Sequence, residues 1–235
     1  MWAVATLADL ARLRPGMVHV TFAGGWEAIR QRGYLLSVAS LVMEANLDPR
    51  EAAGLVTSYR REIVTLKLSD GSQAVLRDQL HRRKNVEEAL VDVNEPEWLA
   101  LLNSRVFFFP AGHARVQELI SAYAAKGFVQ EEIRLSTVGL LQGHEDRIEV
   151  TTVNSGSFSR ATAPSRGRST FARLSEVPAR AVGRVQEVTV KYWVPVTDDA
   201  VVGVVRHLPS GKSERVFPSG ARRQAAPSAS RRTHS

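Results

Sequence analysis

The sequence has 235 residues, of which 44% are hydrophobic and 23% are charged, values typical of globular proteins. It contains no cysteine, which excludes disulfides, thiolate zinc sites and a cysteine nucleophile and is typical of a cytoplasmic protein. No apolar run approaches the roughly 20 residues that span a bilayer, so we expect no membrane partner.

The net charge of +7 is concentrated at the C-terminal end. Residues 206–235 hold seven lysines and arginines and one acid, a net charge of +6 that leaves +1 for residues 1–205. This end is also rich in Pro, Ser, Gly and Ala, and it cannot bury enough apolar area to order itself. We therefore expect one domain over 1–205 and a disordered basic tail over 206–235. The tail either contacts nucleic-acid phosphates weakly or is simply solvated.

Helical and extended patterns alternate through the first half of the domain. An apolar run at Met17–Phe22 predicts a strand, and Gly33 ends a short helix after it. An Asp-Pro pair and a capping glutamate at 48–51 predict a helix start. Alternation over 62–68, followed by Asp-Gly and residues 73–77, predicts a hairpin. The other helical patterns of this half cover residues 1–13, 28–31 and 35–46.

The second half continues the alternation. Capping patterns at 85–88 and 94–97 predict two helix starts. Arg105–Phe109 is a continuous apolar run that predicts a buried strand, and His113–Lys126 predicts a helix. A polar loop from 154 to about 176 is long enough to be functional or disordered. Further strands are predicted over 131–136, 147–154, 184–193 and 201–206.

Several common site motifs are absent from the sequence. There is no Walker loop, no Gly-x-Gly-x-x-Gly after a strand and no Gly-x-Ser-x-Gly elbow. Only His144-Glu145-Asp146 places possible metal ligands side by side, and neighbours rarely converge on one metal, so we expect no metal site. Arg166-Gly167-Arg168-Ser169 fits either an anion-binding turn or ordinary loop charges.

An ordered set of landmarks remains. Val18-His19-Val20-Thr21 lies on the first strand, and Gly33-Tyr34-Leu35-Leu36-Ser37 follows a helix. Arg77-Asp78 comes next, then Glu187-Val188-Thr189-Val190 before Val194-Pro195 and a last apolar strand. Across roughly residues 7–205 the chain resembles an uncharacterised bacterial family of unknown function. Through these landmarks it also resembles the ADP-ribosyltransferase superfamily, especially toxins that modify thymidine in DNA.

The resemblance implies an α+β fold with split, mostly antiparallel β-sheets flanked by helices. It also implies transfer of ADP-ribose from NAD to an acceptor, nucleic acid or protein, that the sequence does not name. The transition state is oxocarbenium-like, and a carboxylate beneath the sugar stabilises its positive charge. The resemblance assigns this catalytic role to Glu187.

The same resemblance implies the residues that bind NAD. His19, with Thr21 beside it, hydrogen-bonds the ribose on the adenosine side of NAD. Arg77 contacts the diphosphate or the nicotinamide side, since guanidinium binds phosphate oxygens bidentately. Phe107 or Phe108 stacks on the nicotinamide ring.

Each of these residues also has a simpler interpretation. His19 fits a strand histidine bonded to backbone, Arg77 and Asp78 fit an ion pair, and Glu187 fits a solvent-facing position. The phenylalanines fit a core. Two other functions therefore stay open. One is a non-catalytic interaction module on the same fold, and the other is a protein that binds nucleic acid through its basic tail. The enzyme hypothesis predicts that His19, Arg77 and Glu187 converge on one cleft with an aromatic wall, with His19 and Glu187 on the same face of the sheet.

Overall fold

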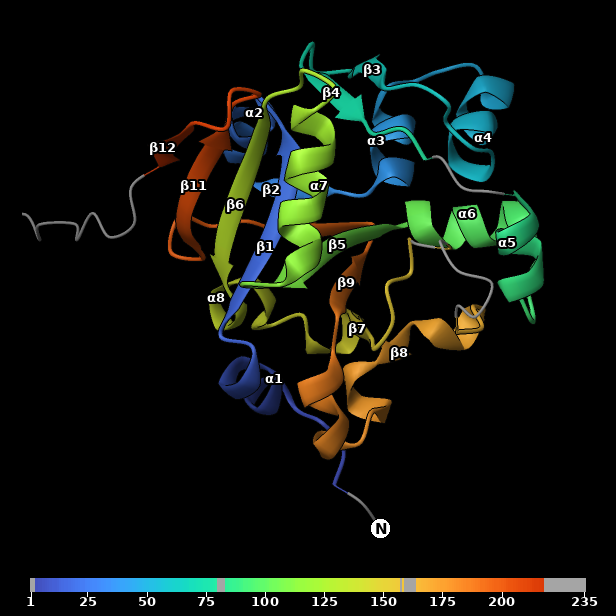
Figure 1. The fold of residues 1–235 in the computed structure, drawn as a ribbon, viewed down its shortest axis with the longest axis vertical. Helices are drawn as coiled ribbons and strands as arrows, with labels where there is room; N and C mark the ends of the chain where they lie inside the picture. The colour runs from blue at the N-terminus through green and yellow to red at the C-terminus, as the bar shows by residue number, and fades with distance from the viewer. Residues whose placement is uncertain (1–2, 80–82, 157, 159–163, 218–235) are drawn as a thin grey trace, which may run out of the picture.

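An eight-stranded antiparallel sheet forms the centre of the molecule (Figure 1). The computed structural model describes residues 3–79, 83–156, 158 and 164–217. Two hairpin-sized sheets accompany the large one: β10 (Trp193–Pro195) with β2 (Tyr34–Leu36), and β3 (Val64–Lys67) with β4 (Gln73–Leu76). The large sheet has the order β12 (Ser213–Phe217), β11 (Val201–His207), β6 (Gln130–Ser136), β1 (Gly16–Phe22), β5 (Arg105–Pro110), β9 (Glu187–Lys191), β7 (Ile148–Thr151) and β8 (Ala172–Arg173).

Helices surround the sheets, which confirms the predicted α+β class. None of the described helices is both long and apolar enough to cross a membrane. The α-helices are α1 (Leu7–Leu13), α2 (Gly25–Arg32), α3 (Val38–Glu44), α4 (Pro49–Thr57), α5 (Arg83–Ala89), α6 (Glu95–Asn103), α7 (Ala114–Ala124) and α8 (Thr137–Leu141).

Local sequence signals explain several of these boundaries. The side chain of Asp48 accepts a hydrogen bond from the Arg50 amide at 2.9 Å, as an N-cap before a helix that opens on proline. Asn94 and Glu97 form the predicted capping box of α6. Gly71 closes the β3–β4 hairpin at φ 82°, a conformation that favours glycine.

The two faces of the large sheet bury different cores. Helix α7 crosses the face of β1 and β6 (Figure 1), where Val18 and Val20 pack against Val116 and Ile120. The main core lies on the opposite face and includes Met17, Phe108 and Val188. Because successive strand residues point to opposite faces, β1 and β5 each supply both cores.

The sheet is open between β1 and the first half of β5. Strand β1 pairs with β6 along its whole length, from Gly16 to Phe22. It pairs with β5 at two positions alone, Met17 with Pro110 and Val18 with Phe109. Beyond Val18 the two strands diverge. This opening gives the fold its predicted split.

The ordered chain extends beyond the expected boundary at residue 205. Strand β11 continues to His207 and β12 covers Ser213–Phe217, with Phe217 packed against the ring of Trp26 at 5.4 Å. The expectation of a disordered tail is therefore wrong for residues 206–217. Val216 and Phe217 pack against the main core, which the overall composition of this end did not indicate. The remainder of the predicted tail, 218–235, lies outside the described residues.

A second difference concerns the predicted strand over 184–193. Residues up to Arg184 form a 3₁₀ helix, and β9 begins only at Glu187. Tyr192 then adopts φ 63°, outside the range of a strand, and the chain continues as β10. The amide of Tyr192 donates to the carbonyl of Ser104 and its carbonyl accepts from the amide of Ser37, so this kink joins β9 to the small β2–β10 sheet.

Candidate functional site

A cavity of about 690 Å³ lies at the opening between β1 and β5. This volume falls within the roughly 300–1,000 Å³ of small-molecule sites. Its walls come from β1, α2, β2, β4, β5, the end of α6 and the loop around Ser155. Five of the predicted site residues line it, namely His19, Thr21, Arg77, Phe107 and Glu187.

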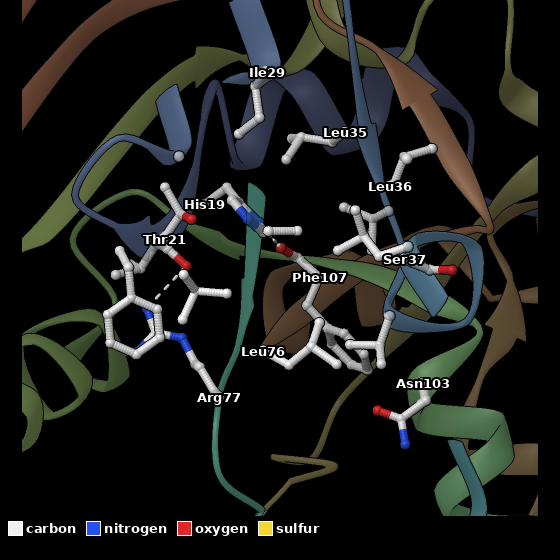
Figure 2. Close-up of a pocket in the computed structure, with 18 of the residues that line it drawn as sticks. His19, Thr21, Ile29, Leu35, Leu36, Ser37, Leu76, Arg77, Asn103 and Phe107 are labelled. Carbon is white, nitrogen blue, oxygen red and sulfur yellow. Dashed lines mark hydrogen bonds between the residues drawn. The ribbon is translucent and has the colours of Figure 1, made fainter. Parts of the chain in front are cut away.

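His19 sits where the two strands part, and Figure 2 shows its imidazole directed at the main chain of Phe107. The Nδ1 atom lies 3.0 Å from the Phe107 carbonyl oxygen. Because a carbonyl oxygen only accepts, Nδ1 carries the hydrogen. Burial lowers the pKa of His19 to about 4, so the ring is neutral at physiological pH. The Nε2 atom is therefore an acceptor, suited to a hydroxyl donor.

Thr21 follows His19 on the same face of β1 and lies beside it in Figure 2. The chain then turns into α2 very close to this side chain. A Cβ atom at Gly25 would lie 2.3 Å from the Thr21 hydroxyl oxygen, so only glycine fits there. The Gly-Gly sequence thus brings the start of α2 against the cavity.

Arg77 is held by two rings and one carbonyl. Its guanidinium carbon lies 4.7 Å from the ring centre of Phe22 and 4.5 Å from that of Tyr123. Its Nη2 donates to the carbonyl of Val20 at 3.1 Å. The Nη1 atom is buried and has no partner among the described residues. Arg77 therefore presents an oriented donor that a ligand oxygen can satisfy.

The expected alternative of an Arg77–Asp78 ion pair is not what the structure shows. The carboxylate of Asp78 pairs with Lys126 Nζ at 2.7 Å and accepts a short hydrogen bond from the Tyr123 hydroxyl. Although burial opposes it, the bonds from Lys126 and Tyr123 leave the pKa of Asp78 below its usual value. Asp78 thus fixes α7, whose Tyr123 ring covers Arg77, and no carboxylate of the described residues forms a salt bridge with the arginine.

Glu187 is buried rather than solvent-facing, with 2% of its surface exposed. Both carboxylate oxygens lie 3.2 Å from the amide of Ser155, which donates to them. Burial is the main cause that raises its pKa to about 7, against the opposing effect of the Ser155 hydrogen bonds. A carboxyl group with this pKa exchanges protons at neutral pH, as general acids and bases do.

His19 and Glu187 reach the cavity from opposite faces of the sheet. Val18 lies opposite Phe109, and Phe108 lies opposite Val188. Alternation therefore puts His19 on the side of Phe108 and Val188, and Glu187 on the other side. Both line the cavity because β1 and β5 are no longer paired there. The expectation that His19 and Glu187 share one face of the sheet is therefore wrong, and they reach the cavity through the opening between the two strands.

The two candidate stacking rings, Phe107 and Phe108, point to opposite faces of the sheet. Phe107 lines the cavity and packs edge-on against Phe171, with ring centres 6.1 Å apart. Phe108 is fully buried in the main core and does not line the cavity. Neighbouring strand residues face opposite ways, so Phe108 serves the core and not a ligand.

Sequence inspection missed a polar cluster at the lower end of the cavity, formed by Arg60, Gln79 and Asn103 (Asn103 is labelled in Figure 2). Arg60 is 5% exposed and donates to the carbonyl of Arg77 at 2.9 Å and to the Asn103 side-chain oxygen at 3.3 Å. Burial lowers its pKa to about 10. Arg60 lies in a polar segment that resembles a loop, so no hydrophobic periodicity predicts that it is buried.

Two further motifs of the sequence, the possible metal ligands at 144–146 and the possible anion-binding turn at Gly167, can be compared with the structure. Throughout the described part of the chain, no group of three His, Asp or Glu side chains could hold a metal. The proposed anion-binding turn at Gly167 already holds a carboxylate, because Asp92 accepts from the amide of Arg168 at 2.9 Å. The turn therefore recognises an anion that the chain itself supplies.

The fold and the cavity define an α+β protein with a small-molecule-sized site at the opening of a split antiparallel sheet. The sequence model of a family of unknown function, DUF7002, matches residues 15–201. The chain belongs to this family, as the resemblance in its sequence predicted. No curated protein and no solved structure matches the chain.

Proposed function

We propose that the cavity binds NAD and that the protein transfers ADP-ribose from it to an acceptor. The observation that carries the proposal is the meeting of His19, Arg77 and Glu187 in one cavity of about 690 Å³. A neutral hydrogen-bond acceptor, an arginine whose Nη1 has no partner within the described part of the chain, and a titratable carboxyl group are the chemistry that a ribose, a diphosphate and a sugar cation require.

His19 supports binding of the ribose. With Nδ1 committed to Phe107, its Nε2 accepts from a ribose hydroxyl without a change of protonation state. Arg77 supports binding of the diphosphate, since the Nη1 that lacks a partner among the described residues would donate to a phosphate oxygen. Phe107 offers an aromatic wall for the nicotinamide.

Glu187 supports the chemical step. When the bond between nicotinamide and C1′ breaks, its electron pair goes to the nicotinamide nitrogen and positive charge develops on the ribose. An ionised Glu187 stabilises that charge. The acceptor oxygen or nitrogen then bonds to C1′, and its proton passes to the carboxylate, whose pKa of about 7 suits this exchange.

Titration calorimetry with NAD tests the binding part of the proposal. We expect saturable binding by the wild type, weakened by Arg77→Met and by His19→Ala. The matched control is Arg30→Met, which removes a cation from the exposed face of α2 where it pairs with Glu27. Absence of NAD binding by a folded wild type would overturn the proposal.

A non-catalytic nucleotide-binding module is the second candidate. It is favoured by the burial of Glu187, by the Ser155 amide on both of its oxygens and by its position on the opposite face from His19. This candidate predicts NAD binding without release of nicotinamide, whereas the enzyme releases nicotinamide and loses that activity in Glu187→Gln.

A further inference from the structure

The loop that contacts Glu187 is tied to a distant part of the chain. The amide of Ser155 donates to both oxygens of Glu187, and the amide of Gly156 donates to the side chain of Asn154 at 3.2 Å. The main-chain carbonyl of Asn154 accepts from Arg166 Nη2 at 2.8 Å. The carbonyl bound by Arg166 and the amide that holds the carboxylate therefore belong to the same peptide group, the one that joins Asn154 to Ser155.

Arg166 is itself firmly anchored. It is 2% exposed, its amide donates to the carbonyl of Ala89 at 2.7 Å, and its carbonyl accepts from the amide of Val91 at 3.0 Å. Its Nη1 also donates to the carbonyl of Pro164. The main-chain bonds join the loop to the end of α5, and the bond to Pro164 restrains the guanidinium itself.

We infer that Arg166 is a positioning residue, which holds the loop at Asn154 and thereby keeps the Ser155 amide on the carboxylate of Glu187. Its role in catalysis rests on the proposed function, but the contact itself does not. Arg166 never needs to touch the substrate, since its guanidinium acts through the main chain of the loop.

The charges around Glu187 predict the direction in which its pKa changes when Arg166 is replaced. Among the described residues, two cations act on its carboxylate, Arg166 from the loop and Arg115 from α7. The facing position on β7 is Thr151, which is not charged. Loss of Arg166 removes one cation and loosens the Ser155 hydrogen bonds, and both changes favour the protonated form.

The test is a carbon-13 NMR titration of the Glu187 carboxyl group in the ligand-free protein, assigned with Glu187→Gln. Arg166→Met should move the midpoint upward by about half a pH unit or more. Arg168→Met is the matched control, because Arg168 is exposed and pairs with Glu97. It should leave the midpoint where the wild type has it.

An unchanged midpoint in folded Arg166→Met would overturn the inference. If that variant does not fold, Arg166→Leu likewise removes both the charge and the donor toward Asn154, and an unchanged midpoint there overturns the inference equally. A parallel pH profile of nicotinamide release should shift with the midpoint. A wild type that releases no nicotinamide refutes the proposed function, and the titration still decides the role of Arg166.

Discussion

The imidazole of His19 and the carbonyl oxygen of Phe107 are joined at 3.0 Å across the opening between two strands of one sheet. This bond links β1 to β5 just beyond Val18, where the main-chain pairing of the two strands ends. It also fixes which ring nitrogen can face a ligand. The simpler interpretation of His19, a strand histidine bonded to backbone, is therefore correct for one nitrogen and leaves the other for binding.

The first prediction concerns the pH dependence of NAD binding. Since burial lowers the pKa of His19 to about 4, the ring stays neutral between pH 6 and 8 and its Nε2 stays an acceptor. Affinity measured by calorimetry should not follow a histidine titration in that range. His19→Ala should cost about 1 kcal/mol, which is roughly fivefold in the dissociation constant. A loss of affinity with a midpoint near pH 6.5 that persists in Glu187→Gln would contradict a neutral His19 ring.

The second prediction concerns stability. The pKa of Glu187 is raised from 4.5 in the unfolded chain to about 7 in the fold, so the folded state binds more protons between these values. Stability contributed by the protonated form is present below pH 4.5 and is lost as pH rises through 7. Glu187→Gln should therefore be more stable than the wild type at pH 8, by at most about 3 kcal/mol, and equal to it near pH 4.

Urea unfolding at the two pH values measures this difference. Glu149→Gln is the matched control, because Glu149 is also buried and pairs with Arg105 at 2.7 Å. Breaking that buried pair should destabilise the protein by about 3–5 kcal/mol at pH 8. If Glu187→Gln also destabilises the protein at pH 8, then Glu187 is ionised and well compensated in the fold.

The third prediction separates charge from packing at Arg77. Arg77→Met keeps an unbranched chain between the rings of Phe22 and Tyr123 but removes the donors. A hydrogen bond to a charged group contributes about 1.5–3 kcal/mol, so the affinity for NAD should fall by roughly 10- to 150-fold. Arg30→Met should bind like the wild type. Equal losses in the two variants would point to a general charge effect instead.

The fourth prediction distinguishes the neighbouring phenylalanines. Phe108→Ala should cost about 3–5 kcal/mol of stability, because the side chain is fully buried in the main core. Phe107→Ala should cost less stability and should weaken NAD binding. Denaturant midpoints and calorimetry on both variants give the comparison. Stronger binding loss in folded Phe108→Ala than in Phe107→Ala would reverse the assignment.

Much of the fold was predictable because its signals are local. Capping residues such as Asp48 and Asn94, the Asp70-Gly71 turn and the alternating apolar runs gave the class and most elements. The exceptions depend on long-range contacts. Strand β12 is stabilised by Phe217 against Trp26, and the end of β9 is set by the bonds of Tyr192 to Ser104 and Ser37. Neither has a local pattern.

The candidate site was predictable only in part. The resemblance to a known superfamily singled out His19, Arg77 and Glu187, and all three line the cavity. It did not reveal that Glu187 is buried or that it lies on the opposite face from His19, because strand register decides both. Arg60 was missed, and Ser155 was recognised as part of a loop without being given a role, since the partners of both residues are far away in sequence.

Incubation of the protein with NAD labelled in its adenosine part, in the presence of total cell extract, tests the central claim most directly. The account predicts release of nicotinamide and transfer of the label to an acceptor by the wild type, with a loss of at least about 100-fold in folded Glu187→Gln. Folded wild type that binds NAD but neither releases nicotinamide nor transfers label between pH 6 and 9 would contradict it and favour the non-catalytic module.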